Sequence, residues 1–506
     1  MKDTNLAVRP DAFRLLAEIS RFFSERGIQA FVVGGFVRDT LQGRVTADID
    51  IAVDADAVRL APDIAAVLGG KPVTLDADNR ISRIVLPERE WEIDVTSFSG
   101  DIRDDLARRD FTINAMAYQL DESIESGIDP VRIIDPFNGR DDMGRGIVRA
   151  VSDTAFADDP ARLLRAVRIA GELAFSIYPG TEDMIRRDSR LITAVAGERD
   201  REELLRLLAL PGAGEHLFRL DRLGLLTGLI PELGPARGTG QPLIHVWDVL
   251  EHSIRTVTAV EFALREGTWD YAAEDILSTV PWSGQLAAHF DEPVSSGSTR
   301  RVMLKLATLL HDIAKPQTKT LGDDGRARFL GHPNEGADVA AAILERLRFS
   351  RRETHLVELL VKYHMRPTQM SHEGLPTSRA IYRFFRDTGE AGTDILFLCL
   401  ADHLATRGDT LDRDEWENHA AMTAFILAEH DEKTSISMPP KLIDGNEIIQ
   451  QFGIEPGPQV GRILEALREA QAAGEVTDKK QAADYINQMI TGSSRADADE
   501  PLQGEL

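Results

Sequence analysis

Two aspartates separated by one residue, Asp48 and Asp50, lie in an alternating run of Asp and Ile that is typical of a β-strand. Side chains two residues apart in a strand point to the same face, so both carboxylates should project together while the isoleucines pack behind them. Two like charges this close are unfavourable unless a cation lies between them. Magnesium takes oxygen ligands and bridges substrate phosphates, so the pattern predicts a magnesium site for phosphoryl transfer.

A double glycine, Gly34-Gly35, ends an apolar, β-prone run and opens an expected helix that carries Arg38. Glycine lets backbone N–H groups approach a phosphate closely, and the start of a helix favours an anion. Each short motif alone occurs often by chance, but the ordered combination of strand, double glycine, Arg-Asp and Asp-x-Asp is more specific. A third acidic residue, Asp94, lies on a later expected strand, where a place near the metals and a solvent-facing place are equally compatible with the sequence.

A second group of candidate metal ligands is spread over helical segments in the second half of the chain. Its members are His252, His311, Asp312, His332, His364 and Asp402. Imidazole and carboxylate ligands together suit manganese, iron, nickel or zinc better than calcium. The interval between His252 and His311 is long, so His245 is an alternative to His252, with a poorer fit.

The elements that must position these residues differ along the chain. Within residues 1–120, helical and strand-like patterns alternate, with a helix expected over 12–26 and strands over 29–33, 48–53, 81–86 and 91–98. From Asp159 onward helical spacing dominates, with helices expected over 161–174, 202–210, 243–261, 301–314, 337–347 and 353–363. The sequence therefore predicts an α+β protein, with a mixed α/β head and an all-α remainder.

Breaks in this pattern divide the chain into segments. Residues 234–242 are rich in glycine and proline and predict a linker. Residues 269–299 are long and irregular and end in a Ser/Gly cluster, so we expect an insertion with a mobile tip. The predicted segments are a head at 1–150, a neck at 151–235, a helical domain at 240–430 with an insertion at 265–300, a C-terminal unit at 431–490 and a disordered tail at 491–506.

Length and composition exclude several classes of protein. The 506 residues exceed one ordinary domain, and 43% hydrophobic and 28% charged residues are typical of a folded chain. The single cysteine, Cys399, excludes an internal disulfide and a cysteine-based zinc cluster. The sequence contains neither an apolar signal core nor the ~18 uninterrupted apolar residues of a membrane helix, so we expect a cytoplasmic protein without a membrane partner. The net charge of −25 argues against a generic nucleic-acid coat, but not against a local basic surface.

The motifs of the first half resemble the class II nucleotidyltransferases, the family of tRNA CCA-adding enzymes and bacterial poly(A) polymerases. The resemblance rests on GGFVRD at 34–39 with the Asp-x-Asp pair, and continues in RRDFTINAMA at 108–117, IDPFNG at 134–139 and DDPARLLRAVR at 158–168. It implies that Asp48 and Asp50 hold magnesium. It also implies that the ribose and triphosphate of a nucleotide lie against Gly34, Gly35, Arg38, Arg109, Asp110 and Asn114.

In this family an Asp and an Arg three residues apart in the neck pair with the base edge of the incoming CTP or ATP. Here these residues are Asp159 and Arg162. Residues three apart share a helix face, and Arg supplies forked donors while Asp supplies acceptors. The family usually has Glu where Asp158 stands, so the hydrogen bonding that holds Arg162 is expected to differ. Arg165 and Arg168 extend the same stripe toward phosphates.

The dispersed histidines and aspartates resemble the ordered His, His-Asp, Asp pattern of the HD-domain phosphohydrolases. The resemblance implies that one metal is shared by His252, His311, Asp312 and Asp402. It implies that His332 and His364 hold a second metal or bind phosphate. In that family a metal-bound water attacks a phosphoester. An HD fold also persists as a tRNA-holding scaffold without turnover, so both interpretations stay open.

Residues 442–461, with a helix expected over 463–473, resemble the C-terminal unit of many enzymes of the nucleotidyltransferase family. The resemblance implies an RNA-anchoring role, and a helical hairpin that only packs is the alternative. A tRNA partner for so acidic a chain requires basic residues to cluster, and we expect this of Arg165, Arg168, Arg186, Arg187 and residues 346–352.

The predicted function is template-independent addition of CTP and ATP to a tRNA 3′ end, to build or repair CCA. A poly(A) polymerase, or an enzyme that adds only CC or only A, is the alternative within the same class. A phosphohydrolase with a degenerate head and a non-catalytic tRNA-binding module are alternatives from other classes, and the intact acidic motifs argue against both.

Overall fold

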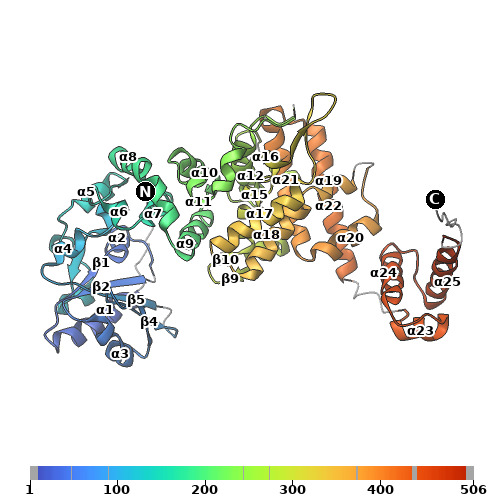
Figure 1. The fold of residues 1–506 in the computed structure, drawn as a ribbon. Helices are drawn as coiled ribbons and strands as arrows, with labels where there is room; N and C mark the ends of the chain where they lie inside the picture. Colours follow the sequence, from blue (N-terminus) through green and yellow to red (C-terminus); the bar gives the residue numbers. More distant parts are fainter. Residues whose placement is uncertain are drawn as a thin grey trace, which may run out of the picture. The chain divides into compact units, whose positions relative to one another are not determined.

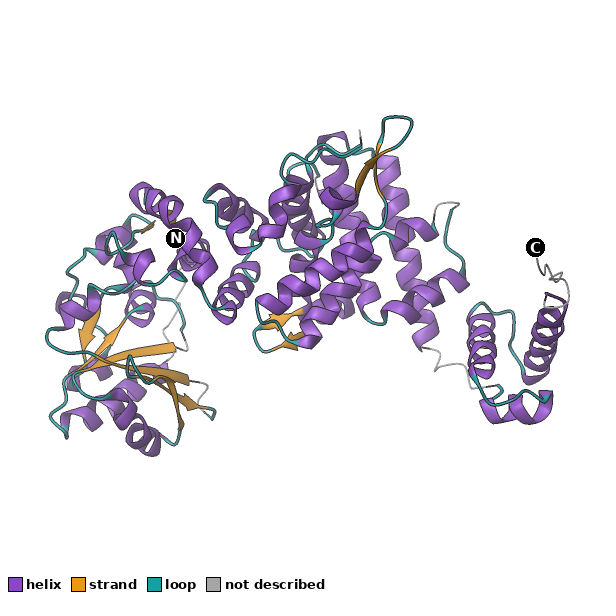
Figure 2. Cartoon of the chain, viewed as in Figure 1, coloured by secondary structure: helices purple, strands orange, loops and turns teal. Residues whose placement is uncertain are grey.

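The computed structural model describes residues 10–46, 48–88, 91–242, 244–272, 274–371, 374–435 and 442–496. The chain forms two compact units, Met1–Leu210 with Phe218–Leu229, and Pro211–Leu217 with Ile230–Leu506. The first unit combines a sheet with helices and the second is almost entirely helical, as Figures 1 and 2 show. This organisation confirms the predicted α+β class.

The first unit is built on a six-stranded sheet in the order β3-β4-β5-β2-β1-β6. Its strands are β1 (Ala30–Val33), β2 (Asp48–Val53), β3 (Lys71–Asp76), β4 (Ile81–Leu86), β5 (Trp91–Ser97) and β6 (Ala117–Gln119). β2 and β5 are parallel, and the other neighbouring strands are antiparallel. The sequence pattern predicts four of these strands, β1, β2, β4 and β5. It does not predict β3, which is largely exposed at the sheet edge, or β6, which has only three residues.

The two faces of the sheet are covered differently. The odd-numbered residues of β2 are apolar and belong to the larger core, which is closed by α1 (Pro10–Ser24) and α3 (Ala57–Leu68). Asp48, Asp50 and Ala52 share the opposite face, where Ala52 packs in a second, smaller core. Because a one-residue slip would exchange the two faces, burial of the isoleucines fixes the register that directs both carboxylates away from the larger core.

Short helices connect and follow the sheet. They are α2 (Gly35–Leu41), α4 (Ile102–Leu106), α5 (Gly139–Gly144), α6 (Ala155–Asp158), α7 (Arg162–Leu173), α8 (Pro179–Asp188), α9 (Gly197–Leu208), α10 (Ala213–Arg222) and α11 (Leu226–Leu229). The parallel pair β7 (Ile147–Val148) and β8 (Ser176–Ile177) lies among them. Helix α7 buries a leucine- and alanine-rich stripe and packs against α9, so the residues on these two helices can contact one another.

The second unit is a bundle around α21 (Ala391–Arg407), whose residues are almost all buried and which packs against α12, α15 and α18. Its other helices are α12 (Val249–Ala263), α15 (Arg300–Leu310), α16 (Lys315–Thr318), α17 (His332–Arg346), α18 (Arg351–Tyr363), α19 (Arg366–Met370), α20 (Ser378–Thr388) and α22 (Arg413–Ser435). A hairpin of β11 (Lys319–Leu321) and β12 (Ala327–Phe329) joins α16 to α17. Within the described ranges, none of the helices combines the length and apolar character of a membrane span.

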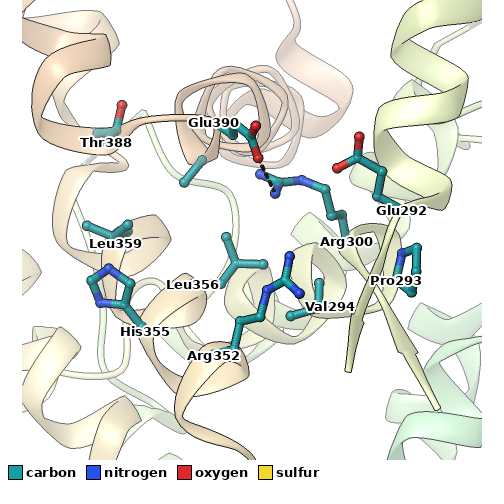
Figure 3. Close-up of a pocket in the computed structure, with 11 residues that line it drawn as sticks. Glu292, Pro293, Val294, Arg300, Arg352, His355, Leu356, Leu359, Thr388 and Glu390 are labelled. Carbon is teal, nitrogen blue, oxygen red and sulfur yellow. Dashed lines mark ion pairs between the residues drawn. The ribbon is translucent and has the colours of Figure 1, made fainter. Parts of the chain in front are cut away.

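The insertion at 265–300, expected to be irregular, is folded, and this corrects the prediction. It contains α13 (Glu274–Thr279), α14 (Gly284–Asp291), β9 (Pro293–Ser295) and β10 (Ser298–Thr299). Phe290 stacks on Trp282 and meets Phe397 of α21 edge-on, so buried aromatic rings order the segment. The Ser/Gly cluster forms the turn of the β9–β10 hairpin. Figure 3 shows this hairpin beside a pocket in which Arg300 pairs with Glu390.

The C-terminal helices are α23 (Gly445–Phe452), α24 (Pro458–Ala472) and α25 (Lys479–Ala496), and they share a core of their own. Residues 491–496 of the expected tail are helical instead, because α25 continues to Ala496. Ile486 and Met489 anchor this helix in the C-terminal core, and Thr491 bonds back to the carbonyl of Asn487, so the helix propagates beyond its last apolar contact. Residues 497–506 of the predicted tail lie outside the described residues.

Candidate functional site

β2 presents Asp48 and Asp50 on one face, with Asp48 exposed and Asp50 half-buried. Burial raises the pKa of Asp50 to about 6, the carboxylates of Asp94, Asp48 and Asp110 raise it as well, and the guanidinium of Arg109 opposes them. Burial and the neighbouring carboxylates thus disfavour the charged form of Asp50, and a bound cation would favour it. Two carboxylates on one strand face, short of a counter-charge, fit magnesium well.

Gly34 forms the turn beside this acidic pair. Its φ of +72° lies in the left-handed region. A Cβ at this position would lie 2.8 Å from Asp50 Oδ2 and 3.0 Å from Arg109 Nη1. The backbone therefore approaches the acidic pair as closely as glycine allows, and a larger residue would displace either the carboxylate or the guanidinium. The next residue, Gly35, begins α2.

Arg38, which is expected to lie against the triphosphate, is buried and bonded within the protein. Its Nε and Nη2 donate to Asp39 at 2.8 and 3.0 Å, and its Nη1 donates to Asn114 Oδ1 at 2.7 Å. Asn114 in turn donates through Nδ2 to Asp110 Oδ1 at 3.1 Å. Arg38 and Asn114 thus connect the 108–117 motif to α2. These bonds favour a supporting role for Arg38 over direct contact with phosphate.

Two further charged groups border the acidic pair. Asp94 lies next to Asp50 in the parallel register of β2 and β5, but Arg83 holds it with two hydrogen bonds of 2.7 and 2.9 Å. This ion pair favours a structural role for Asp94 over that of a third metal ligand. Arg109 donates from Nε and Nη2 to Asp105 at 3.2 Å each, and its Nη1 faces Gly34.

The neck residues expected to read a base are held by different neighbours. Arg162 donates to the carbonyl of Arg108 at 2.7 Å and, more weakly, to the carbonyls of Ala155 and Arg109. Its Nε lies 3.8 Å from Asp159, which is itself bound by Arg199. Asp158 accepts a hydrogen bond from the hydroxyl of Thr154. Arg162 is held instead by the backbone carbonyls named above.

Arg165 and Arg168 converge on one buried carboxylate, that of Glu203 on α9. Their Nε atoms donate to Glu203 at 2.9 and 2.6 Å respectively. Arg168 also pairs with Glu172 at 2.7 Å, whereas Arg165 lies 3.6 Å from Asp110. Both ion pairs of Arg168 are therefore made with side chains of the neck. Arg165 is the arginine that approaches the 108–117 motif, through Asp110.

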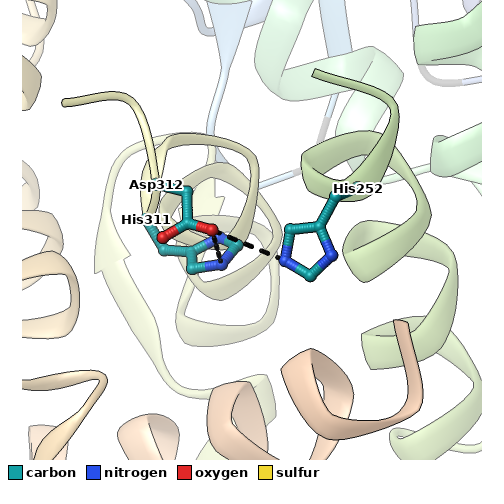
Figure 4. A group of neighbouring side chains, drawn as sticks. All are labelled: His252, His311 and Asp312. Atoms are coloured by element: carbon teal, nitrogen blue, oxygen red, sulfur yellow. Dashed lines mark ion pairs between the residues drawn. The ribbon is translucent and has the colours of Figure 1, made fainter. Parts of the chain in front are cut away.

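The second unit brings together three buried candidate metal ligands, His252 of α12 and His311 and Asp312 at the end of α15, as Figure 4 shows. His252 Nε2 lies 3.5 Å from Asp312 Oδ2, and His311 Nε2 lies 3.2 Å from the same oxygen. Asp402 Oδ1 lies 3.1 Å from His252 Nε2. Buried nitrogens of both histidines and Oδ1 of Asp312 have no conventional hydrogen-bond partner, and Asp312 Oδ2 lies 2.6 Å from Lys315 Nζ. Imidazole and carboxylate together fit a transition metal.

Asp312 also faces a second group, formed with His332 and His364. Its Oδ1 lies 3.4 Å from His332 Nε2 and 3.8 Å from His364 Nε2. His311, His332 and His364 each donate from Nδ1 to a carbonyl three residues earlier, at 2.7 Å. These bonds fix the tautomer that leaves each Nε2 free as a ligand. His245 belongs to neither group and packs edge-on against His252.

Family models match three consecutive parts of the chain. A poly A polymerase head domain matches residues 30–149, a probable RNA and SrmB-binding site of polymerase A matches 174–236, and an HD domain matches 249–407. An A-adding tRNA nucleotidyltransferase of Deinococcus radiodurans is 33% identical over 465 residues, covering 90% of this chain and 94% of that protein. A CC-adding tRNA nucleotidyltransferase of Thermus thermophilus is also 33% identical, covering 90% and 93%.

The chain is a member of the tRNA nucleotidyltransferase family. This confirms the resemblance drawn from its motifs. The fold agrees with that of solved tRNA nucleotidyltransferases. A Thermotoga maritima CCA-adding enzyme complexed with tRNA aligns with a TM-score of 0.60 at 21% identity over 95% of each chain. A CCA-adding enzyme in complex with ATP aligns with a TM-score of 0.63 at 21% identity over 96% of each chain.

Sequence reasoning missed several residues that this member of the tRNA nucleotidyltransferase family places at the sites. Arg199 and Glu203 hold the neck motif, and Lys315 lies 2.6 Å from Asp312. Only Lys315 carried a signal, because it lies four positions after His311 in the sequence. The expected basic cluster is largely neutralised by ion pairs. Its pairs include Arg186–Glu182, Arg187–Asp188 and Arg346–Glu232.

Proposed function

We propose that the chain adds CMP and AMP, taken from CTP and ATP, to the 3′ end of tRNA without a template. The single observation that carries this proposal is the acidic pair of β2, Asp48 and Asp50, set against the glycine turn at Gly34. The two similar proteins, an A-adding and a CC-adding tRNA nucleotidyltransferase, support tRNA as the acceptor.

In this mechanism Asp48 and Asp50 would hold magnesium, which would activate the attacking hydroxyl and neutralise the leaving pyrophosphate. The 3′ oxygen of the RNA forms the new bond to the α-phosphorus, and the bond to the β-phosphate oxygen breaks. Gly34 keeps the backbone clear of side-chain bulk beside the acidic pair. Arg109, held at the turn by Asp105, brings a guanidinium to the place where phosphates would lie.

Base selection falls to Asp159 and Arg162 in this proposal. A carboxylate accepts and a guanidinium donates, so together they match the donor and acceptor pattern of a base edge. Arg162 now donates to three backbone carbonyls, of Arg108, Arg109 and Ala155. Reading a base therefore requires Arg162 to exchange at least one of these acceptors for the nucleotide.

One assay tests the proposed reaction and its nucleotide range together. Purified protein is incubated with magnesium, labelled CTP or ATP, and three tRNAs that end before the first C, before the second C or before A. Addition to all three indicates CCA synthesis, whereas addition to only one class indicates a CC-adding or A-adding enzyme. Repeated AMP addition indicates a poly(A) polymerase. No incorporation into any RNA contradicts the proposal.

A second function, phosphoester hydrolysis by the HD domain, is favoured by one specific observation. Asp312 directs one oxygen to His252 and His311 and the other to His332 and His364, all four histidines being buried. This arrangement fits two metal ions that share a carboxylate. The test is hydrolysis of phosphomonoesters and cyclic phosphodiesters by protein loaded in turn with manganese, nickel and zinc. Without turnover in any of these forms, the domain would be a scaffold.

A further inference from the structure

A cavity of about 170 Å³ in the second unit is bordered by the β9–β10 hairpin, the start of α18 and the junction of α20 and α21 (Figure 3). One side of it is apolar and includes the buried residues Val294, Leu356 and Ala391. A single water needs only ~10–15 Å³ of such volume, so the cavity admits a group of several non-hydrogen atoms. The described residues that line it include neither the acidic pair of β2 nor the histidines of the metal cluster.

Arg300 is the buried charged group of this cavity, with only 7% of its surface exposed. Its Nε donates to His289 Nε2 at 3.1 Å, and its Nη2 donates to Asp394 Oδ2. Among the described residues, Nη1 has one ion pair, with Glu390 at 3.8 Å, which is too long for a hydrogen bond. The guanidinium is thus fixed by two contacts and still has N–H donors to offer to the cavity.

A second guanidinium, that of Arg352, points into the same cavity in Figure 3. Arg352 is exposed, and within the described ranges it has neither a hydrogen bond nor an ion pair. Two cations that face one space repel each other unless an anion lies between them. The cavity therefore combines two forked sets of N–H donors that match the oxygens of an anion.

Three helices begin at this cavity. Arg300 is the first residue of α15, Arg352 the second of α18 and Ala391 the first of α21, and all three line it. The first turn of a helix carries N–H groups without helical partners and a partial positive charge. α15 and α21 have no hydrogen bond from a capping side chain, and Asp394 in the first turn of α21 is already bound by Arg300. The helix starts therefore favour an anion, as the guanidiniums do.

We propose that this cavity binds a phosphate group, held by Arg300 and Arg352 where the three helices begin. Forked guanidiniums fit phosphate oxygens, and burial of Arg300 strengthens the attraction. Two sources can supply the phosphate. One is the backbone of a bound tRNA, and the other is free phosphate or the pyrophosphate that the proposed reaction releases.

The site is separate from the metal cluster of the same domain. α15 begins with Arg300 and leads to His311, and α18 carries Arg352 in its first turn and leads to His364. Each interval is 11 or 12 residues, or about 16 to 18 Å at 1.5 Å per residue. The cavity and the candidate metal ligands thus lie at opposite ends of the same two helices.

A cation is the competing occupant, because the carboxylates of Glu292 and Glu390 also border the cavity. Glu390 is 83% exposed and lies near Arg300 Nη1, so its carboxylate takes the place of an incoming anion. The two occupants predict opposite effects of Glu390→Gln. Loss of a competing carboxylate strengthens the binding of an anion, whereas loss of a ligand weakens the binding of a cation.

The full-length protein is compared with Arg352→Ala and Glu390→Gln. Arg351→Ala is the matched control for the first variant, because Arg351 is exposed one position earlier on α18 but does not line the cavity. Glu345→Gln, at an exposed position of α17, is the control for the second. Calorimetry without divalent metal gives Kd for inorganic phosphate and for pyrophosphate, and hydrogen exchange locates the amides that they protect. Kd for tRNA at several salt concentrations and the midpoint of thermal unfolding are measured alongside.

Phosphate is expected to protect the first turns of α15, α18 and α21. Arg352→Ala should raise Kd for phosphate roughly tenfold relative to Arg351→Ala, through loss of a charge-assisted hydrogen bond. Glu390→Gln should lower this Kd about threefold, because the ion pair that it removes is exposed and weak. Glu345→Gln should keep the wild-type value.

The tRNA measurements distinguish the two sources. If the tRNA backbone supplies the phosphate, Arg352→Ala weakens tRNA binding more than Arg351→Ala does and reduces the salt slope by about one. Equal tRNA binding by these two variants, with protection by phosphate or pyrophosphate, assigns the site to the free anion.

The inference is overturned if neither anion protects these helix starts and the two arginine variants bind tRNA equally. A higher Kd for phosphate in Glu390→Gln would contradict it as well. None of these measurements requires nucleotide addition, so failure of the proposed function and failure of this inference can be told apart.

Discussion

Asp50 and Asp94 lie side by side on the parallel strands β2 and β5, and Asp94 is held by two hydrogen bonds from an arginine, whereas Arg109 acts on Asp50 only through its charge. Arg83 neutralises Asp94 through two hydrogen bonds, whereas the guanidinium nearest Asp50, that of Arg109, is bound to Asp105. We therefore expect different roles for these two neighbouring aspartates. Asp94 belongs to an ion pair between β4 and β5, whereas Asp50 is proposed to hold magnesium.

Asp50→Asn should abolish nucleotide addition while leaving the fold intact. The variant keeps the shape of the side chain but removes the charge that holds magnesium, which should cost several kcal/mol of transition-state stabilisation, or at least ~100-fold in rate. Initial rates across a magnesium titration, with thermal unfolding in parallel, provide the measurement. Asp94→Asn is the control and should retain most activity, because Asp94 is already paired. Near wild-type turnover in Asp50→Asn would show that the metal lies elsewhere.

Arg162→Ala should impair nucleotide selection more than magnesium dependence, because Arg162 lies apart from the acidic pair and donates to no carboxylate of it. The measurement is kcat/KM for CTP, ATP, UTP and GTP, together with the magnesium concentration that gives half-maximal rate. We expect a loss of selectivity of about tenfold or more, with the magnesium requirement unchanged. A variant that still accepts only the correct nucleotides at the normal rate would remove Arg162 from this role.

Changing His311 and Asp312 together to Ala should abolish metal binding and any phosphohydrolase activity of the HD domain while sparing nucleotide addition. Both side chains are fully buried, and Asp312 contacts both histidine groups. The bound manganese, nickel or zinc is measured directly, so the result does not depend on turnover alone.

His355→Ala is a suitable control for this double variant, since His355 lies in the same domain but its side chain is 70% exposed. Vacating a buried metal site also lowers stability, so thermal unfolding must be compared in the metal-loaded and metal-free forms. If the double variant lost nucleotide addition while remaining folded, the two sites would not be independent.

Acid should weaken the packing of α24 against α20. Glu469 of α24 accepts from Arg383 and Arg386, and the hydrogen bond from Arg383 lowers the pKa of Glu469 below its usual value. A carboxyl with a lowered pKa in the folded state stabilises the fold above its unfolded-state pKa, and this contribution is lost as the pH falls through the folded-state value. The packing should therefore be strongest near neutral pH and decline in acid.

Hydrogen exchange of the α24 amides between pH 7 and pH 3, corrected for the intrinsic pH dependence of exchange, measures this effect. Glu469→Gln should already show the weakened packing at pH 7 and a smaller change on acidification. Glu455→Gln, at an exposed position of the same C-terminal unit, should behave as the wild type. Equal protection of α24 in Glu469→Gln and wild type at pH 7 would show that the ion pairs do not hold this contact.

The features that sequence reasoning predicted have a local cause. Asp48 and Asp50 share a face because strand geometry alternates, and the inward Nε2 atoms of the histidines follow from hydrogen bonds only three residues long. The order of helices in the second unit follows from apolar spacing in the same way. Each of these signals is contained within a few residues of the group it positions.

The features that were missed depend on distant partners. Arg199 lies in a charged run, GERDREE, that is typical of a solvated helix face, and its contact with Asp159 spans 40 positions. The same holds for the hydrogen bond from Arg38 to Asn114, which spans 76 positions. The insertion was also misjudged, because the ring that orders Phe290 and Trp282 belongs to Phe397 on α21. Tertiary partners decide these three cases.

The four-residue interval between Arg199 and Glu203 has a consequence for how the gene can change. An α-helix turns about 100° per residue, so inserting or deleting one residue in this interval would move one of the two side chains to another face of α9. Asp159 would then lose its arginine, or Arg165 and Arg168 would lose their shared carboxylate. A substitution between Arg199 and Glu203 leaves both side chains on the same face of α9, whereas an insertion or deletion there does not. Among homologous chains, α9 should therefore tolerate varied residues between these two positions and reject any insertion or deletion there.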